Sequence, residues 1–489
     1  MLRFYFLIAI LFLPTLSKGQ EYFKKTRIES QLGFISSTSK TTPFLLRSNQ
    51  YGLVPLESQV GFVSGSVRLE YDSLFTQTKK LKPFGFGYGF TPHINFGVKN
   101  QILIPEAYAK VRFKSFEIYA GRRKEIQGLV DTLGTMGSYI WSGNALPMPK
   151  VEISIPNYTS IIGNGLVSMK GNFAHGWFGK GDSVQNVLLH HKSLYVKIGK
   201  PSWKIRMIGG FNHQVQWGGY PTKPFYDNIS KQTISKFGMD FPTYFKVVSG
   251  ISLSKGGEGW ENQSGVSANE AGNRAGNHLG TVDIGMELKL KNSRLLFYRQ
   301  SIFDDGSLFY LNNISDGLFG VSFARLKSRG IINNITFEYL NTSNQGGRYF
   351  FDQAPQLRGV DNYFNNSIYL DNWTYKNKVI GNPLLIPVKI LELENSRFKN
   401  PNFIINNRVT AINFSVFYDF MLINACTQVV SSRNFGSYGF PIDKSQISFM
   451  QKVSYSNKGF EYNATLAGDL GEFLKNRIGL SLGFKKVFR

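Results

Sequence analysis

Apolar and polar residues alternate one by one along many stretches of the chain. In residues 106–114, for example, Val111 and Phe113 fall on one side of an extended backbone, whereas Lys110 and Arg112 fall on the other. The same alternation is found at residues 63–72, 203–214, 282–291 and 478–488. A period of two predicts β-strands with one apolar face and one charged face. We therefore expect an all-β chain that runs as one long antiparallel meander.

Strands of this kind fit two types of protein. The charged face can meet water on a soluble sheet, or it can line the lumen of an outer-membrane barrel whose apolar face meets lipid. The predicted strands are long enough for a bilayer crossing, which takes about 9–11 tilted residues. The apolar faces are rich in aromatic residues, and the last strand ends with Phe488 next to the terminal Arg489. These features favour a transmembrane antiparallel β-barrel, with a large soluble β-sandwich or propeller as the alternative.

Two polar, Gly- and Asn-rich stretches interrupt the strands, Lys255 to His278 and Asn341 to Asn402. Prolines at positions 355, 383, 387 and 401 break the second stretch. Long loops of outer-membrane barrels lie on the extracellular side. We expect both stretches to be extracellular loops, the second long enough to fold back into the pore.

The first 19 residues have the pattern of a secretory signal peptide. Arg3 is followed by an apolar run from Phe4 to Leu13, and small residues at Ser17 and Gly19 precede the expected cleavage point. We therefore expect two parts, a signal peptide at 1–19 and an outer-membrane β-barrel at 20–489. Residues 21–42 show no convincing helical amphipathicity, so we expect little or no helical plug at the mature N-terminus.

The composition and the short motifs indicate an anionic partner and exclude several kinds of catalytic and metal site. The 489 residues include 56 Lys and Arg against 32 Asp and Glu, a formal net charge of +24, which implies an anionic partner or environment. The single cysteine excludes a disulfide scaffold and Cys-cluster metal sites. The six histidines lack the His-Glu-x-x-His spacing of a zinc protease, and neither Gly-Lys pair forms a phosphate-binding loop. The one G-x-S-x-G sequence, at 479–483, lies within a predicted strand and lacks a following acid and histidine. We therefore expect no enzyme, no cofactor and no metal.

Several ordered segments resemble the Wzi family of outer-membrane capsule-assembly proteins, in the form found in Bacteroidota. They are residues 42–52 (TPFLLRSNQYG), 120–124 (AGRRK), 141–147 (WSGNALP), 276–280 (GNHLG), 298–300 (YRQ), 304–306 (DDG), 315–318 (SDGL), 337–342 (FEYLNT), 344–346 (NQG), 361–366 (DNYFNN) and 381–384 (GNPL). The resemblance covers about residues 42 to 385. It implies a bacterial outer-membrane barrel of about 18 strands with its loops facing the cell exterior. It also implies a lectin that anchors exported capsular polysaccharide and performs no covalent chemistry. The enterobacterial form carries an N-terminal helical bundle, from which this chain departs.

The candidate polysaccharide-binding residues come from three sources. Predicted lumen-facing cations can attract a polyanion, Trp rings in or near loops can stack on sugar rings, and polar residues of the family-like segments can bind glycan hydroxyls. They are Arg112, Arg122, Arg123, Lys124, Trp141, Asn144, Arg206, Trp217, Arg299, Gln300, Asp361, Tyr363 and Trp373. Each type has a structural alternative: the cations can form internal ion pairs, and the Trp residues can be interfacial anchors. Acids such as Asp316, Glu338 and Asp361 can hold loops.

The leading hypothesis is thus a lectin for anionic surface polysaccharide. The other expected partners are outer-membrane lipid, lipopolysaccharide and capsule-export proteins, and we expect no nucleic acid. The rivals are a porin or selective channel for anionic oligosaccharides and a scaffold for another envelope machine. A channel requires an open lumen, whereas a lectin can be closed by its loops.

Overall fold

The computed structural model describes residues 25–71, 82–227, 231–251, 274–304, 307–326, 330–349, 359–391 and 400–488. The predicted signal peptide lies outside these residues. The chain enters its first strand at Arg27.

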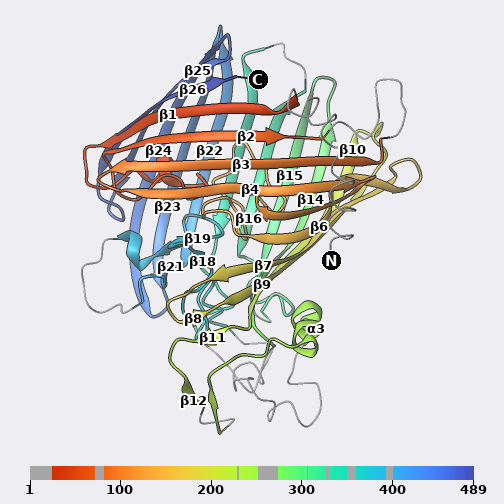
Figure 1. Ribbon diagram of the computed structural model, residues 1–489, viewed down its shortest axis with the longest axis vertical. Helices are drawn as coiled ribbons and strands as arrows, with labels where there is room; N and C mark the ends of the chain where they lie inside the picture. The colour runs from red at the N-terminus through yellow and green to blue at the C-terminus, as the bar shows by residue number, and fades with distance from the viewer. Residues whose placement is uncertain are drawn as a thin grey trace, which may run out of the picture.

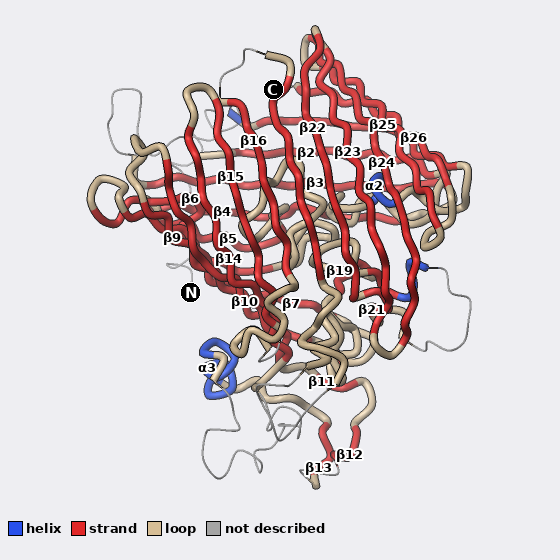
Figure 2. Tube along the Cα trace, turned by 180° about the vertical axis from the view of Figure 1, so that it is seen from behind, coloured by secondary structure: helices blue, strands red, loops and turns tan. Residues whose placement is uncertain are grey.

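Eighteen antiparallel strands form one closed barrel (Figures 1 and 2). Each strand pairs with the next one along the wall, and the first pairs with the last, from Glu29 opposite Val487 to Ser37 opposite Gly479. The wall strands are β1 (Arg27–Ser37), β2 (Val60–Leu69), β3 (Phe84–Gly97), β4 (Gln101–Phe113), β5 (Phe116–Arg122), β6 (Lys150–Ile162), β7 (Val167–Gly179), β9 (Val187–Ile198), β10 (Ile205–Trp217), β14 (Asn277–Lys289), β15 (Ser293–Phe303), β16 (Gly317–Arg325), β17 (Ile332–Asn341), β22 (Arg408–Phe420), β23 (Ile423–Ser437), β24 (Phe440–Asn457), β25 (Phe460–Gly471) and β26 (Arg477–Val487). The predicted outer-membrane barrel fold is confirmed.

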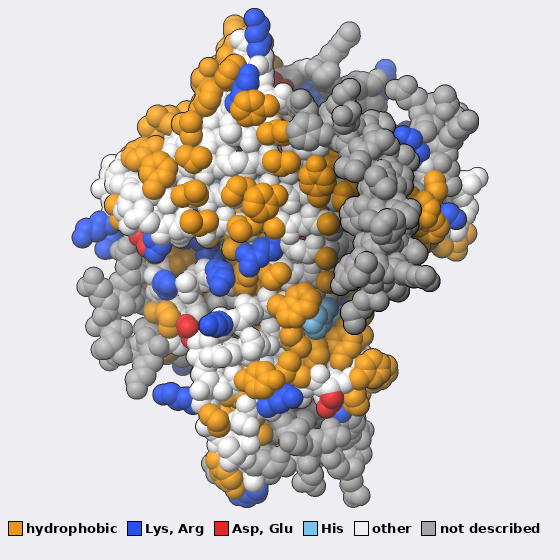
Figure 3. Space-filling view, in the orientation of Figure 1, with side chains coloured by type: hydrophobic (Ala, Val, Ile, Leu, Met, Phe, Trp, Pro, Cys, Tyr) orange, Lys and Arg blue, Asp and Glu red, His pale blue; other side chains and the backbone are white. Residues whose placement is uncertain are grey.

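The alternation in the sequence separates the two faces of the wall. On β4, Val111 and Phe113 are 49% and 46% exposed, whereas Lys110 and Arg112 are buried on the lumen side. β10, β14 and β26 likewise turn apolar residues outward, and hydrophobic side chains spread over the outer face (Figure 3). An apolar outer face and a polar lumen are the arrangement that lipid requires.

The connections differ in length between the two ends of the barrel. Because successive strands are antiparallel, connections alternate between the ends. One end, here called the loop end, carries the long connections 38–59, 123–149, 218–276, 304–316 and 342–407. The other, the turn end, carries short turns such as 114–115, 421–422 and 458–459, the start of β1 and the end of β26. At 458–459, Lys458 and Gly459 have φ values of 46° and 79°, and a two-residue hairpin turn favours such positive values.

The loop-end connections contain short elements of their own. These are α2 (Phe44–Arg47), β8 (Val184–Gln185), β11 (Tyr220–Pro221), β12 (Phe225–Asp227), β13 (Gln232–Ile234), α3 (Phe241–Ser249), β18 (Thr374–Tyr375), β19 (Lys378–Val379), β20 (Ile386–Pro387), a 3-10 turn η3 (Val388–Leu391) and β21 (Ile404–Asn406). Asp240 caps α3 by accepting a hydrogen bond from the Thr243 amide at 2.7 Å, and Gly250 ends the helix with a φ of 66°. No helix among the described residues is long and apolar enough to cross a membrane.

The two predicted loop stretches differ in how far they can be traced. Most of the first stretch, up to residue 273, lies outside the described residues, and strand β14 already begins at Asn277. The stretch after Asn341 forms the long connection to β22, with only two-residue and three-residue strands in its described part. Its described part contributes Tyr363, Phe364 and Trp373 to the buried core inside the barrel.

Candidate functional site

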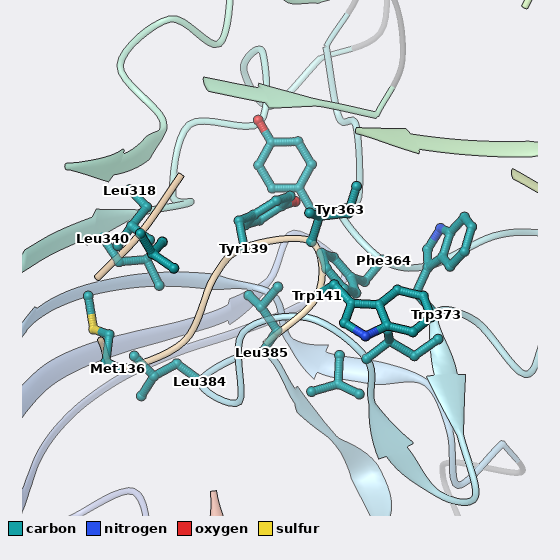
Figure 4. Close-up of a cluster of buried hydrophobic side chains, with 14 of the residues drawn as sticks. Met136, Tyr139, Trp141, Leu318, Leu340, Tyr363, Phe364, Trp373, Leu384 and Leu385 are labelled. Carbon is teal, nitrogen blue, oxygen red and sulfur yellow. The ribbon is translucent and has the colours of Figure 1, made fainter. Parts of the chain in front are cut away.

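Loop segments fill the lumen of the barrel near its loop end. The connection 123–149 and the connection 342–407 share one buried apolar core, in which Tyr139, Tyr363, Phe364 and Trp373 are 0% exposed to solvent. Tyr139 makes edge-on ring contacts with Tyr363 and Phe364 at centroid distances of 6.1 and 5.1 Å. Figure 4 shows these rings facing one another above Leu384 and Leu385. We call the described residues of the connections 38–59, 123–149 and 342–407 together the plug.

Three buried wall carboxylates hold the plug by accepting hydrogen bonds from its backbone amides. Asp283 of β14 accepts from the Leu129 amide at 2.8 Å, and Glu338 of β17 accepts from the Met136 amide at 2.7 Å. Asp469 of β25 accepts from the Phe44 amide at 3.0 Å.

All three acids are 0% exposed. A buried carboxylate is costly unless it is hydrogen-bonded, and a buried amide likewise needs an acceptor, so each bond satisfies both groups. The segment 123–149 leaves the wall after β5 and returns at β6, and its bonds to β14 and β17 fix it across the lumen. The bond to Asp469 fixes the separate connection 38–59.

Asp361 and Tyr363 are two of the predicted site residues in this plug, and both make hydrogen bonds within the loop end. Asp361 accepts from the Ser307 hydroxyl at 2.5 Å, and the Tyr363 hydroxyl donates to Asp316 at 2.9 Å. Asp316 also accepts from the Asn344 and Gln345 amides at 3.0 and 2.7 Å. The alternative role predicted for Asp316, Glu338 and Asp361, that of holding loops, agrees with these contacts.

Asn144 and Gln300 also bind the plug together. The Asn144 side-chain amide donates to the Val379 carbonyl at 3.0 Å, linking the two long connections. Gln300 of β15 accepts from the Tyr139 amide at 2.9 Å. Both side chains are buried.

The predicted lumen cations lie among carboxylates. Arg123 contacts Glu117 and lies 3.6 Å from Glu152, Lys124 lies 4.0 Å from Glu106, and Arg206 pairs with Glu287 at 2.6 Å. Along β2 to β6, the described charged residues that face the lumen include similar numbers of cations and carboxylates. The cations are Arg68, Lys110, Arg112, Arg123, Lys124 and Lys150, and the carboxylates are Glu70, Glu106, Glu117, Glu125 and Glu152. This part of the lumen is therefore close to electrically neutral.

Arg112 and Arg299 have different surroundings. Arg112 donates to the Lys82 carbonyl at 3.1 Å and lies 4.5 Å from the centre of the Tyr71 ring. Arg299 belongs to the outward face of β15, where it lies 4.8 Å from the Phe319 ring and donates to the Ile314 carbonyl. The structure thus does not bring Arg299 together with the lumen cations.

The predicted stacking residues Trp141, Trp217 and Trp373 are buried, with exposures of 5%, 4% and 0%. Trp141 stacks on His191 at 5.6 Å. Trp217 packs on the outer side of the wall beneath α3, where its ring lies 5.2 Å from that of Tyr244. Stacking of a sugar on any of these rings would require the covering segments to move.

A cationic groove opens at the loop end. It has a volume of about 760 Å³ and runs between the plug, the start of β4 and the end of β5. Six cations line it, against the single carboxylate of Glu57 among its described lining residues. The cations are Arg47, Lys99, Arg122, Lys376, Lys378 and Lys389. We call this space the basic groove.

Of the predicted site residues, only Arg122 lines the basic groove. It donates to the Tyr375 hydroxyl at 3.1 Å, next to the cluster Lys376-Asn377-Lys378 in the hairpin β18–β19. Lys376 and Lys389 are exposed. These lysines were not among the predicted site residues, although Lys376 and Lys378 follow Trp373 closely in the family-like region and could have indicated a binding surface.

Lys378 has an unusual electrostatic environment. Its ammonium donates to the Val54 carbonyl at 2.6 Å, and burial together with the nearby Arg47 lowers the pKa of Lys378 to about 7. Burial disfavours the charged form of a lysine, and a like charge adds to this effect. A bound anion near this ammonium would favour its protonated form.

A second cavity, of about 650 Å³, lies beneath the plug and reaches toward the turn end. Its lining mixes Arg68, Lys452 and Lys485 with Glu29 and Glu461. The charges of this cavity are therefore mixed, unlike those of the basic groove. The described residues contain no group of three or more His, Cys, Asp or Glu side chains suited to a metal ion.

Comparisons with known proteins agree with this architecture. The family described as capsule assembly protein Wzi matches residues 38–385. The solved structure of Wzi from Escherichia coli, an outer membrane protein involved in group 1 capsule assembly and a carbohydrate-binding β-barrel, is 14% identical with a TM-score of 0.56, and the match covers 97% of this chain and 87% of that chain.

Two further barrels match with less similar geometry. OccK5 of Pseudomonas aeruginosa is 9% identical, with 95% and 97% of the two chains covered and a TM-score of 0.44. OccAB4 of Acinetobacter baumannii is 10% identical, with 94% and 97% covered and a TM-score of 0.44. No curated protein matches the sequence.

Proposed function

This chain belongs to the Wzi family of capsule assembly proteins, and from that premise we propose that it is a lectin that anchors exported anionic polysaccharide at the cell surface. The family and the closed 18-stranded barrel point to the outer membrane. We further propose that the polysaccharide is anionic, that it binds in the basic groove, and that the loop end faces the cell exterior. It includes no covalent chemistry.

The orientation follows from the connection lengths. Outer-membrane barrels turn long loops to the exterior and short turns to the periplasm. The loop end, with the basic groove, accordingly faces outward, and the mixed-charge cavity faces the periplasm, where capsule-export proteins would deliver polymer. Residues 1–19 serve as the export signal in this scheme. We further propose the Bacteroidota form of the family, which the ordered segments between residues 42 and 385 resemble.

The basic groove is the single observation that carries the lectin proposal. An excess of cations beside low-dielectric walls attracts a polyanion, whereas lumen cations already paired with carboxylates contribute little net field. The groove is exposed at Lys376 and Lys389, so a polymer can reach it without displacing the plug.

The filled lumen weighs against the rival channel function. Conduction of an oligosaccharide requires a continuous water-filled path. Here the segment 123–149 is tied across the lumen to Asp283 and Glu338, and its core residues are buried.

The test is retention of the source cell's own surface polysaccharide on the purified, detergent-solubilised protein, titrated with salt. We expect retention that weakens steeply with salt, because exposed charges are screened over about 10 Å at 0.1 M. The double variant Lys376→Gln/Lys389→Gln should lose most of the retention. The matched control Lys200→Gln/Lys204→Gln removes two exposed cations from the turn end and should retain it. Absence of retention by the unaltered protein at low salt would refute the proposal.

A further inference from the structure

The barrel wall is incomplete beside the basic groove. Strand β5 has seven residues, whereas its neighbour β4 has thirteen. At the turn end the two strands finish together, with Phe113 opposite Phe116, so the shortfall is at the loop end. There the pairing stops at Ala107 opposite Arg122, and the side of β4 that faces β5 is unpaired among the described strands from Gln101 to Glu106.

Strand β6 also stops short of the loop end at this position. It begins at Lys150, opposite Gly121 of β5, while β7 continues three residues farther, to Gly179. The result is a notch two strands wide, bounded by β4 and β7. With about 4.8 Å between strands, β4 and β7 are roughly 14 Å apart across it.

The notch lies at a level where the wall should contact membrane. A strand needs about 9–11 residues to cross the hydrocarbon core, and the seven residues of β5 fall short of this. On the rim of the notch, Ile102 and Ile104 turn apolar side chains outward, with exposures of 75% and 37%. An unpaired strand edge is strongly disfavoured in hydrocarbon, because its backbone N–H and C=O groups have no hydrogen-bond partners there. The notch must therefore face polar material within the outer part of the bilayer.

The basic groove opens through this notch. Its lining runs from Arg47 and Gly52 on the plug to Ile102 and Ile104 on the wall. In Figure 3, Lys and Arg side chains gather in the left centre of the view, next to the hydrophobic side chains of the outer face, where Figure 1 places β18 and β19. Cationic and lipid-facing surfaces therefore adjoin at this place on the wall.

We propose that the notch is a lateral binding site for the phosphorylated headgroup of an outer-leaflet glycolipid. The headgroup phosphates enter the basic groove from the side, while the acyl chains remain in the leaflet against Ile102 and Ile104. Arg122 offers a guanidinium that can bind phosphate with two parallel hydrogen bonds, and Lys376 and Lys389 act as mobile point charges. This site rests on the outward orientation of the loop end in the proposed function. It adds to that function because the basic groove, which would hold the polysaccharide, would also be bound to a lipid of the outer leaflet.

The partner is identified by its combination of groups. A soluble anionic saccharide could use the cations but has no need of a side opening or an apolar rim. A phospholipid with one phosphate could use the rim but would engage only part of a groove lined by six cations. A glycolipid with several anionic groups and acyl chains matches all three features.

The test uses native mass spectrometry of the full chain in detergent, titrated with bisphosphorylated lipid A as the probe. Its dephosphorylated form and its deacylated, phosphorylated saccharide are added in separate titrations. We expect bisphosphorylated lipid A to bind best, and both altered probes to bind at least about tenfold more weakly. The variant Lys376→Gln/Lys389→Gln should bind the intact lipid about tenfold or more weakly, since each basic residue near an anionic lipid surface contributes appreciably.

Controls separate this proposal from the polysaccharide proposal. Lys200→Gln/Lys204→Gln should bind lipid A like the unaltered protein, and all variants should retain the barrel's far-ultraviolet circular dichroism spectrum. Equal binding of the deacylated saccharide would overturn the lipid site, and so would an equal loss in the two double variants. Because lipid binding is measured without polysaccharide, a protein that retains polysaccharide but shows no preference for the acylated probe refutes only the lateral site.

Discussion

Removal of the Glu338 carboxyl should loosen the plug and make the barrel conduct. Glu338 accepts four hydrogen bonds, two of them from the plug residues Thr135 and Met136, each at 2.7 Å. The other two come from wall residues, the Tyr298 hydroxyl at 2.7 Å and the Asn413 amide at 3.1 Å. The carboxyl thus joins the plug to the wall at a fully buried point.

The magnitude follows from these contacts. A buried hydrogen bond contributes about 1 kcal/mol net, and a donor left without an acceptor costs about 1–3 kcal/mol. For Glu338→Ala, loss of the two bonds to the plug should disfavour the seated segment by about 3 kcal/mol. Since about 1.4 kcal/mol is a factor of ten in an equilibrium constant, the unseated population should rise by roughly a hundredfold. Glu338→Gln keeps one acceptor oxygen and should have a smaller effect.

The assay is single-channel conductance in planar bilayers. We expect the unaltered barrel to be nearly silent and Glu338→Ala to show frequent openings. The matched control is Glu461→Ala, because Glu461 lies in the cavity toward the turn end and pairs with Lys485 on the neighbouring strand at 2.5 Å. If Glu338→Ala conducts no more than the control, the carboxyl does not hold the plug. If the unaltered barrel conducts freely, the interpretation of a closed lumen is wrong.

Three further predictions concern separate parts of the molecule. The pKa of Lys378 is lowered to about 7, so its positive charge is present below that pH and is lost as the pH rises through it. Anion binding should therefore weaken from about pH 6 to about pH 8. In a salt-matched binding titration, Lys378→Met should abolish this pH dependence. Trp373→Ala should destabilise the plug core by about 3–5 kcal/mol, measured as earlier protease cleavage of the 342–407 connection while the barrel itself stays resistant. Asp469→Leu should leave the Phe44 amide without its acceptor and lower the thermal midpoint of unfolding, whereas an unchanged midpoint would show that this bond does not hold the connection 38–59.

The barrel could be predicted from the sequence because its determinants are local. Period-two alternation is visible within ten residues, and it assigns Val111 outward and Lys110 inward without knowledge of any partner strand. The short β4–β5 turn also sets the backbone register in which Arg112 lies opposite Glu117, so the mixture of charges on the lumen face of this hairpin could be predicted in part. The strand alternation therefore determines both the fold and the side of the wall on which each cation lies.

The plug and the groove could not be predicted in the same way, because they depend on contacts between distant segments. Glu338 and Met136 are 202 residues apart, and nothing in either local sequence indicates that they meet. The groove brings together Arg47, Arg122 and Lys389, from three parts of the chain that show no shared periodic pattern. Trp373 illustrates the difficulty: a Trp in a polar loop suggests an exposed stacking surface, but this loop returns into the lumen and buries it.

The placement of charge explains how one basic chain can serve a closed barrel. In the lumen, desolvation makes an unpaired cation costly, so Arg123 and Lys150 lie beside carboxylates. At the loop end, water solvates Lys376 and Lys389, and these cations can remain in excess over acids at little cost. A channel for anions would need its excess positive charge along the conduction path, whereas a surface lectin needs it where polymer and outer leaflet meet. Among the described residues, the charge distribution has the form that the proposed lectin requires, so the basic groove and not the lumen is the place to test for the ligand.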